Sequence, residues 1–398
     1  MREEEGMPNY FPYEPEQAEL LPRHVRDELP AGHLCFRIHQ LIEGLDLSEY
    51  DKAYGEEGQR AYNPRLMLKV WLYAFAVNVR STRKLEKRIH EDLAFRFLAG
   101  GARPDHKTLS EFLRRHQSAV EELFAQVLGA MRQAGMVRLG RVAIDSTRIK
   151  ANASPDRLQK VDQKQVRRWR RELESEDPDQ DPGLEINAEQ AERLEQQMKQ
   201  VRSSRGEIKQ SLTDPDARFL RERGGRFRLS YSGELAVSED HVITAVRVTQ
   251  QASDNASLLP MIVEVERRCG RRPEKVLADS GFYSSENLDR MHELGIDGYV
   301  PDSNLARELN TGGHKAAGMG RNPQVRHRET QRMRAKLRTP QGRQLYQRRK
   351  AMVEPVIGSL KEHRGMRQFL RRGLKAVTIE WMMAAISYNI TRLHQQLS

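Results

Sequence analysis

Apolar residues recur at helical spacing through the first third of the chain. A first helix is predicted where they follow one another at steps of three or four residues, at Leu66, Val70, Tyr73 and Val77. Ser81 can cap a second helix, whose apolar residues are Leu85, Ile89, Leu93 and Phe97. Gly100-Gly101 interrupts the pattern, and Thr108-Leu109-Ser110-Glu111 matches a capping box that opens a third helix. Residues 1–135 are therefore predicted to form an all-helical N-terminal domain.

After residue 135 the pattern changes to short apolar runs, which are typical of buried strands. Strands are predicted over Arg138 to Thr147, in a hairpin between Phe227 and Thr249, over Val276 to Ala278, and at Tyr299-Val300. Helices are predicted from about Ser257 to Cys269 and around Leu288. Strands that alternate with helices imply an α/β layer structure, and this order is that of an RNase H-like mixed sheet. We therefore expect an RNase H-like catalytic domain over residues 136–398.

Residues 155–210 interrupt the strand pattern with strongly charged sequence. One apolar stripe comprises Leu158, Val161, Val166, Trp169 and Leu173, and a second comprises Ala191, Leu194, Met198 and Val201. The second stripe steps by three, four and three residues, as in a heptad repeat. An acidic, proline-containing turn separates the two stripes. We predict an antiparallel helical hairpin inserted in the catalytic domain, which is either an internally paired appendage or a protein–protein contact.

Three acidic residues stand where a carboxylate could leave the core and reach a cleft. Asp145 follows the apolar run Val142-Ala143-Ile144, and Asp279 follows Val276-Leu277-Ala278. Glu354 comes just after a dense basic stretch. Each acid alone is explained most simply as a cap or a surface residue. Together, two strand-end aspartates and a glutamate on a later helix resemble the carboxylates with which RNase H-like enzymes hold a pair of divalent cations for phosphodiester chemistry.

The balance of charge favours a polyanionic partner. Lysine and arginine number 67 against 56 aspartates and glutamates, a net charge of +11, which fits nucleic-acid binding; a generally basic surface is the alternative. The two cysteines, Cys35 and Cys269, support neither a disulfide framework nor a cysteine-ligated zinc site. The acidic start is not a signal peptide, and the most apolar stretch, Leu66 to Val79, is too short to span a bilayer. We expect a cytoplasmic protein.

Positive charge is concentrated next to Glu354. From Arg326 to Lys350 there are ten lysines and arginines and one acid. Three of these cations are candidate contacts to the DNA backbone: Arg332, Arg334 and Lys336. A solvated linker is the alternative for this segment. In the N-terminal domain, Arg114 and Arg115 make the third predicted helix basic, which favours a variant helix-turn-helix that binds DNA over a plain helical packing domain.

A further helix is predicted to carry Glu354. At about 100° per residue, four polar side chains fall within about 80° of one another on the helical wheel: Tyr346, Lys350, Glu354 and Lys361. The neighbouring face is apolar and would pack on the sheet, through Val353, Val356 and Leu360. Pro355 conflicts with a continuous helix, because proline removes a backbone hydrogen bond. Either the helix kinks at Pro355 or a new helix begins there.

Taken in order, these stretches resemble bacterial insertion-sequence transposases of the DDE type, in particular family eleven-eighty-two, which is related to families four and five. The resemblance covers most of the chain and rests on YNPRLML at 62–68, RPDHKT at 103–108, AIDST at 143–147, DPDAR at 214–218, ADSGFY at 278–283 and the segment 346–361. It implies that Asp145, Asp279 and Glu354 form a metal-binding triad.

The related families carry a Tyr, Arg, Glu, Lys pattern on their last helix. Tyr346, Glu354 and Lys361 match three of its positions. The arginine position falls on Arg349 by its spacing from the tyrosine and on Lys350 by its place on the helical face. By this resemblance, these cations would position DNA phosphates.

The resemblance implies a transposase that binds the inverted-repeat ends of an insertion sequence, cleaves them and joins them to target DNA. The triad would hold two Mg²⁺ ions, or Mn²⁺, which suit carboxylate ligands. The implied partners are double-stranded DNA and a second copy of the chain in a synaptic homodimer, with no membrane partner. The alternatives are a non-catalytic, transposase-derived DNA-binding protein and an RNase H-like nuclease without strand transfer.

Overall fold

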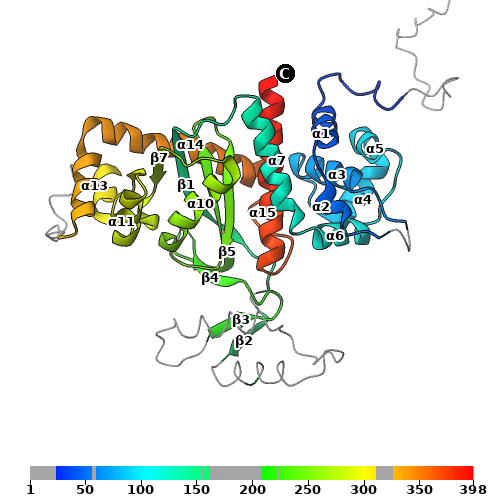
Figure 1. The fold of residues 1–398 in the computed structure, drawn as a ribbon. Coiled ribbons are helices and arrows are strands. Elements are labelled where there is room, and N and C mark those ends of the chain that lie inside the picture. The colour runs from blue at the N-terminus through cyan, green and yellow to red at the C-terminus, as the bar shows by residue number, and fades with distance from the viewer. Residues whose placement is uncertain are drawn as a thin grey trace, which may run out of the picture.

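The computed structural model describes residues 24–55, 60–154, 156–161, 168, 208–222, 224–310 and 326–397. These residues form a mixed α/β protein with a helical N-terminal region (Figure 1). No helix within these ranges is long and apolar enough to cross a bilayer.

The N-terminal region contains the helices α1 Leu34–Glu43, α2 Ser48–Asp51, α3 Pro64–Ala76, α4 Thr82–Glu91, α5 Leu93–Ala99, α6 His106–Arg115 and α7 Ala119–Gln133. The second predicted helix is in fact two, because the Asp92 side chain accepts hydrogen bonds from the first N–H groups of α5. The third begins earlier than predicted. Asp105, not Thr108, caps α6, and its carboxylate accepts from the Thr108 N–H at 2.7 Å. Gly100 ends α5 in the left-handed conformation that glycine favours.

The central sheet is mixed. Its strands are β1 Arg141–Lys150, β4 Arg218–Arg221, β5 Phe227–Ser238, β6 Ile243–Thr249, β7 Lys275–Ala278 and β8 Asp297–Tyr299. The order is β4-β5-β1-β7-β8, and β6 pairs with β5 beside β4. β5 is antiparallel to β1 and to β6, whereas β7 is parallel to both β1 and β8. The predicted hairpin is β5–β6, and the other predicted strands are β1, β7 and β8.

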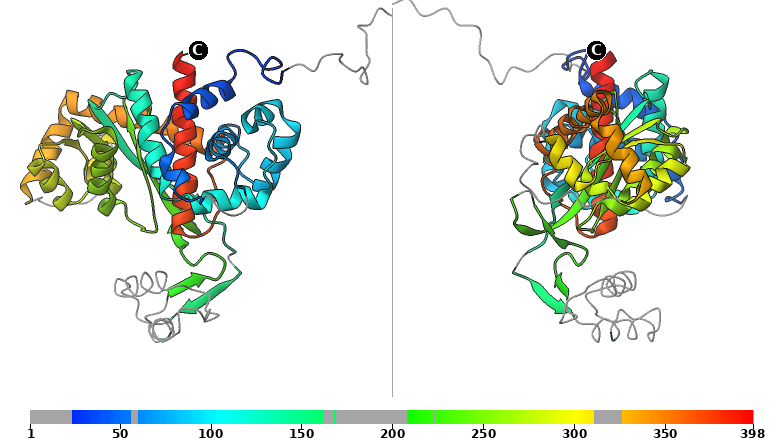
Figure 2. Two further views of the ribbon diagram at one scale, coloured as in Figure 1. Left: turned by 45° about the vertical axis from the view of Figure 1, so that its right-hand side comes forward. Right: turned by 90° about the vertical axis from the view of Figure 1, so that its left-hand side faces the viewer.

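Helices cover both faces of the sheet (Figure 2). They are η1 Asn255–Ser257, α10 Leu258–Cys269, η2 Ser280–Phe282, α11 Ser285–Glu293, α12 Ser303–Asn310, α13 Arg328–Arg338, α14 Pro340–Glu362 and α15 Leu374–Leu397. In β5, Glu234 accepts a hydrogen bond from Ser257 at the start of α10, while the preceding residue, Gly233, lies against Trp381 of α15. Because consecutive strand residues face opposite ways, α10 and α15 lie on opposite faces.

α15 joins the N-terminal helices to the sheet. It is buried almost all round between Val377 and Leu393, and it packs against both α3 and β6 (Figure 1). Polar side chains fix its position. Asn389 exchanges two hydrogen bonds with the backbone of Ile243 in β6, at 2.9 and 2.8 Å, and Ser387 donates to the Leu72 carbonyl of α3 at 3.0 Å.

The predicted insertion begins and ends differently from our expectation. Leu158 and Val161, which we assigned to a helical stripe, lie in strand β2 Leu158–Val161. This strand pairs antiparallel with β3 Ile208–Ser211, and the two form a ribbon below the main sheet (Figure 1). A chain that leaves and re-enters through paired strands needs no helix at its base. Apart from Arg168, the predicted helical hairpin between the two strands lies outside the described residues.

Candidate functional site

Asp145 and Asp279 stand side by side at the centre of the sheet. The parallel pairing of β1 with β7 runs to Ile144 opposite Ala278, so the two aspartates are the next residues of the two strands. β7 stops there, and Asp279 caps η2, its carboxylate accepting from the Gly281 N–H at 2.9 Å. β1 continues to Lys150. Asp145 therefore lies inside its strand, and the prediction of a strand end at this residue is wrong. Asp145 is buried at 7% exposure.

The charge of Asp279 disfavours the ionised form of Asp145. Burial raises the pKa of Asp145, and the neighbouring charge of Asp279 raises it further, while Arg349 opposes the rise. A desolvated carboxylate beside a second acidic residue needs a nearby cation to remain ionised.

Arg349 of α14 supplies that cation. Its Nη1 donates to Asp145 Oδ2 at 2.6 Å, and the two side chains are only 9% and 10% exposed. Tyr346, one turn earlier, is also buried, with its ring centroid 6.0 Å from the Arg349 guanidinium carbon. Burial raises the pKa of the Tyr346 hydroxyl. The structure therefore places Arg349, and not Lys350, against the acidic pair.

A cavity adjoins this cluster on α14. Its volume is about 250 Å³, and Tyr346, Arg349 and Lys350 line it. Lys350 is exposed, as are Arg343 and Arg348 on the same helix. Among the described residues none of these three exposed cations has an ion-pair partner. Arg343 and Lys350, which line the cavity, make its mouth basic, and this suits an incoming phosphodiester.

Glu354 does not join the two aspartates in this structure. It is exposed on α14, and within the described ranges no three His, Cys, Asp or Glu side chains lie close enough to hold a metal ion. At about 100° per residue, the Glu354 side chain is rotated by about 140° from that of Arg349 around the helix axis. α14 therefore cannot direct both side chains toward the sheet at once. The predicted polar face is divided, because Tyr346 packs inward while Lys350 and Glu354 face solvent. The apolar face is confirmed, since Val353, Val356 and Leu360 are buried.

Pro355 lies inside a continuous helix. α14 runs from Pro340 to Glu362 without a break, so no new helix begins at Pro355. The carbonyl of Ala351, four residues earlier, loses its usual backbone donor. Ala351 is exposed, and water can satisfy that carbonyl.

Asp254 is an acidic residue of this region that the sequence patterns did not indicate. It follows β6 in a loop and accepts hydrogen bonds from Ser146 Oγ at 2.7 Å and Ser232 Oγ at 3.4 Å. It also lies beside Asp279, because a Cβ atom at Gly281 would sit 3.0 Å from Asp279 Oδ1 and 3.5 Å from Asp254 Oδ2. An acid soon after a strand end is the signal that could have identified it.

The predicted DNA contacts on α13 are largely engaged within the fold. Arg334 donates two hydrogen bonds to Asp302, at 2.7 and 2.9 Å. Lys336 pairs with Asp297 and donates to the Gly298 carbonyl. Arg332 pairs with Glu329 at 2.6 Å on the surface. Arg334 and Lys336 therefore hold α13 against the edge of the sheet.

The other predicted DNA-contact residues are more accessible to solvent or less engaged with acidic side chains. Arg114 is exposed and pairs with Glu111 at 2.6 Å, and Arg115 lies over the Tyr54 ring at 5.6 Å. Lys361 is half-buried on α14. Neither α6 residue is held by a buried carboxylate.

Two segments of the chain match known protein families. Residues 23–115 match the family described as "Transposase domain (DUF772)", and residues 311–394 match the family described as "Transposase DDE domain". No curated protein and no solved structure matches the chain. The first segment covers α1 to α6, and the second contains Arg349 and Glu354, whereas Asp145 and Asp279 lie between the two. The two matches support a DDE transposase.

Proposed function

We propose that this protein is a DNA transposase that binds the inverted-repeat ends of an insertion sequence, cleaves them and joins them to target DNA. The observation that carries the proposal is the pair Asp145–Asp279, placed side by side where β7 ends and faced by a basic helix, in a chain that transposase families match on either side. Asp145, Asp279 and Glu354 are the proposed catalytic and metal-binding residues.

The fold supports this assignment. The order β6-β5-β1-β7-β8 consists of three antiparallel strands followed by two parallel ones, which is the arrangement we expect for an RNase H-like sheet. In this arrangement the two aspartates arise from adjacent central strands and the glutamate from a helix that crosses them. α14 packs against both β1 and β7, as that role requires.

The aspartates fit divalent cations. Carboxylate oxygens are the ligands that Mg²⁺ and Mn²⁺ prefer, and the repulsion between two neighbouring carboxylates is relieved by a cation. When bound, such ions would polarise the scissile phosphodiester and activate water or a DNA 3′-OH. Asp145 and Asp279 would hold them, and Glu354 would complete the set after its side chain, or α14, turns toward the pair.

The basic residues of the site would hold the DNA strand. Arg349 can exchange its bond to Asp145 for a bond to a phosphate, and Tyr346 confines the guanidinium. Exposed cations on α14 would contact the neighbouring backbone. Lys361, Arg332, Arg114 and Arg115 remain proposed DNA contacts, and Arg334 and Lys336 become secondary because the fold already engages them. The proposed setting is a cytoplasmic synaptic homodimer on double-stranded DNA.

One observation favours a second candidate function. Glu354 is exposed and Arg349 occupies Asp145, an arrangement that also suits a transposase-derived protein that binds DNA without cutting it. Incubation of the purified protein with Mg²⁺, labelled element ends and target DNA distinguishes the candidates. A transposase gives both cleaved ends and joined products. Cleavage without joining identifies a nuclease, and binding without cleavage identifies the non-catalytic protein.

A further inference from the structure

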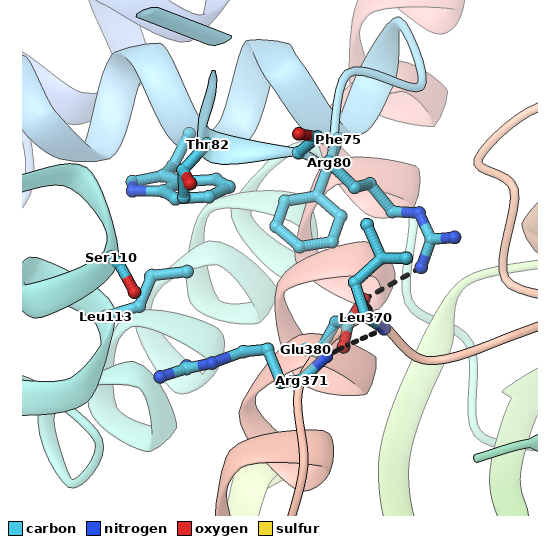
Figure 3. Close-up of a pocket in the computed structure, with 10 residues that line it drawn as sticks. Phe75, Arg80, Thr82, Ser110, Leu113, Leu370, Arg371 and Glu380 are labelled. Atoms are coloured by element: carbon cyan, nitrogen blue, oxygen red, sulfur yellow. Dashed lines mark hydrogen bonds and ion pairs between the residues drawn. The ribbon is translucent and has the colours of Figure 1, made fainter. Parts of the chain in front are cut away.

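A second cavity, of about 360 Å³, lies where the N-terminal helices meet the C-terminal segment. Its walls come from α3, α4, α6, the loop after α14, and α15 (Figure 3). It is separate from the acidic pair, since no residue of that site lines it. Its volume lies within the range of small-ligand sites, about 300–1,000 Å³.

The negative charge in this cavity is already neutralised. Glu380 pairs with Arg80 at 2.8 Å, with both side chains below 10% exposure. It also accepts the backbone N–H groups of Leu370 at 3.1 Å and Arg371 at 3.0 Å. The Arg80–Glu380 pair therefore leaves no net charge for a ligand.

Arg371 contributes a positive charge that is not matched. Its side chain extends away from Glu380 toward Ser110 and Leu113 (Figure 3). Its Nη1 atom is buried, with no hydrogen-bond partner in the described part of the chain. Burial and the charge of Arg114 both lower the pKa of the Arg371 guanidinium, while Glu380 raises it. Burying a guanidinium nitrogen without a partner costs free energy, and an anionic ligand would remove that cost.

The remaining walls combine flat apolar surface with hydroxyl groups. Trp71 uses its indole N–H on the Leu109 carbonyl and is only 2% exposed, so it contributes a small apolar part of the cavity wall. Leu370, 42% exposed, adds an aliphatic side chain at the opening. Ser81 precedes α4 without capping it through its side chain, so its hydroxyl remains available. A cation, hydroxyls and an apolar wall together suit a phosphate that carries a planar base.

We propose that this cavity binds one unpaired nucleotide of a DNA strand, with its phosphate at Arg371 and its base against the apolar wall. The inference rests on the proposed function only in that DNA is the partner. A duplex is too wide to enter such a cavity, whereas a single nucleotide from a melted or single-stranded segment is of suitable size. A free nucleotide shares this chemistry, and the experiment must distinguish the two sources.

The test measures binding of a labelled oligothymidylate and of a labelled duplex to the full-length protein by fluorescence anisotropy. Arg371→Gln is compared with Arg372→Gln, which removes the same charge from the adjacent residue. Arg372 is exposed and donates to the Asn152 carbonyl outside the cavity. Arg371→Gln should weaken oligothymidylate binding about tenfold, a loss of about 1.4 kcal/mol, and duplex binding much less. Arg372→Gln should alter both probes equally and slightly. Equal effects of the two variants would overturn the proposal.

A second variant fills the cavity without changing its charge. Ser110 is exposed on α6 at the cavity wall, so Ser110→Trp should fold normally and still lower oligothymidylate affinity. Retained affinity would contradict the proposal even if Arg371→Gln failed to fold. Thymidine monophosphate should compete poorly; competition as strong as that of the oligonucleotide would identify a free-nucleotide site instead. If the wild-type protein binds neither probe, the proposed function fails, whereas duplex binding with no selective loss refutes the cavity proposal alone.

Discussion

At the residue scale, the buried ion pair between Arg349 and Asp145 lies at the centre of the candidate site. Both side chains are buried, so removal of one partner leaves the other charged and desolvated. We expect Arg349→Ala to lower the free energy of unfolding by about 3–5 kcal/mol, as for other broken buried pairs. Urea denaturation followed by circular dichroism measures this loss. Lys350→Ala, an exposed neighbour, should change the stability little, and equal losses in the two variants would show that the pair is not the cause.

Glu234 gives the fold a predicted dependence on pH. It is fully buried, and desolvation raises its pKa above the ordinary value of 4.5. The folded protein therefore holds this proton at pH values where the unfolded chain has lost it. Stability should fall as the pH rises from 4.5 through the folded-state pKa, by at most about 1.4 kcal/mol per pH unit for one proton, and stay level above it.

Glu234→Gln removes the titrating group and keeps its shape. The variant should lack this part of the pH dependence when unfolding by urea is measured between about pH 5 and about pH 8, the range in which a raised carboxyl pKa acts. Glu286→Gln, at an exposed position of α11, is the control and should keep the wild-type profile. An unchanged profile in Glu234→Gln would show that Glu234 is ionised throughout.

Residue types and spacing were enough to select Asp145 and Asp279 as candidate site residues. They were not enough to predict every side chain that surrounds the two aspartates. An apolar run followed by an acid identifies a strand and its carboxylate locally, and the parallel register then brings the two together. The choice between Arg349 and Lys350 depends on how α14 is rotated against the sheet, which tertiary packing decides. Asp254 belongs to the site through tertiary contacts, because its partners, Ser146 and Ser232, come from other strands.

At the element scale, α13 and α14 divide the basic segment into two roles. Four of the α13 cations, Arg332, Arg334, Lys336 and Arg338, pair with acids of the fold, whereas Arg343, Arg348 and Lys350 of α14 are exposed. We expect replacement of these three α14 residues by Gln to flatten the salt dependence of duplex binding, by about 0.9 in log–log slope for each phosphate that is no longer neutralised. Arg267, Arg271 and Arg272, exposed before the opposite end of β7, form a control triple of equal charge, of which Arg267 and Arg272 are ion-paired. An equal change of slope in both triples would refute a localised DNA contact.

The β2–β3 ribbon allows the insertion to be removed cleanly. Val161 and Ile208 are cross-strand partners at the end of the ribbon, so a short Gly/Ser linker can join them in place of residues 162–207. We expect this variant to fold and to bind element ends as the wild type does. Loss of folding would contradict the interpretation of the insertion as an appendage to the catalytic domain. Native gel analysis of paired-end complexes then decides its role: their loss indicates a protein–protein contact, and their persistence indicates a passive insertion.

Elements with long, regular patterns were predicted well, and boundaries set by single side chains were not. The α3 helix and the β5–β6 hairpin follow from periodicity alone. The break between α4 and α5 depends on Asp92 binding the N–H groups of the next turn, and the apolar pattern continues across it. Leu158 and Val161 are spaced as on a helix, but pairing with β3 decides their conformation.

At the scale of the whole molecule, α15 makes one body of the N-terminal helices and the sheet. Its buried polar side chains bind the backbone of α3 on one side and of β6 on the other. A DNA duplex held by the N-terminal helices would therefore have a fixed relation to Asp145 and Asp279. This arrangement is consistent with a protein that must recognise an element end and cut it at a set distance.

The central claim is that Asp145, Asp279 and Glu354 act together on DNA, although the structure places only the first two side by side. Mg²⁺-dependent cleavage of pre-bound element ends tests it most directly, in Asp145→Asn, Asp279→Asn and Glu354→Gln, with Glu362→Gln on the same helix as the control. We predict that the first three variants bind ends but lose cleavage by about a thousandfold or more, as expected when an essential group is removed, while Glu362→Gln cuts normally. Near-normal cleavage by Glu354→Gln would contradict the account.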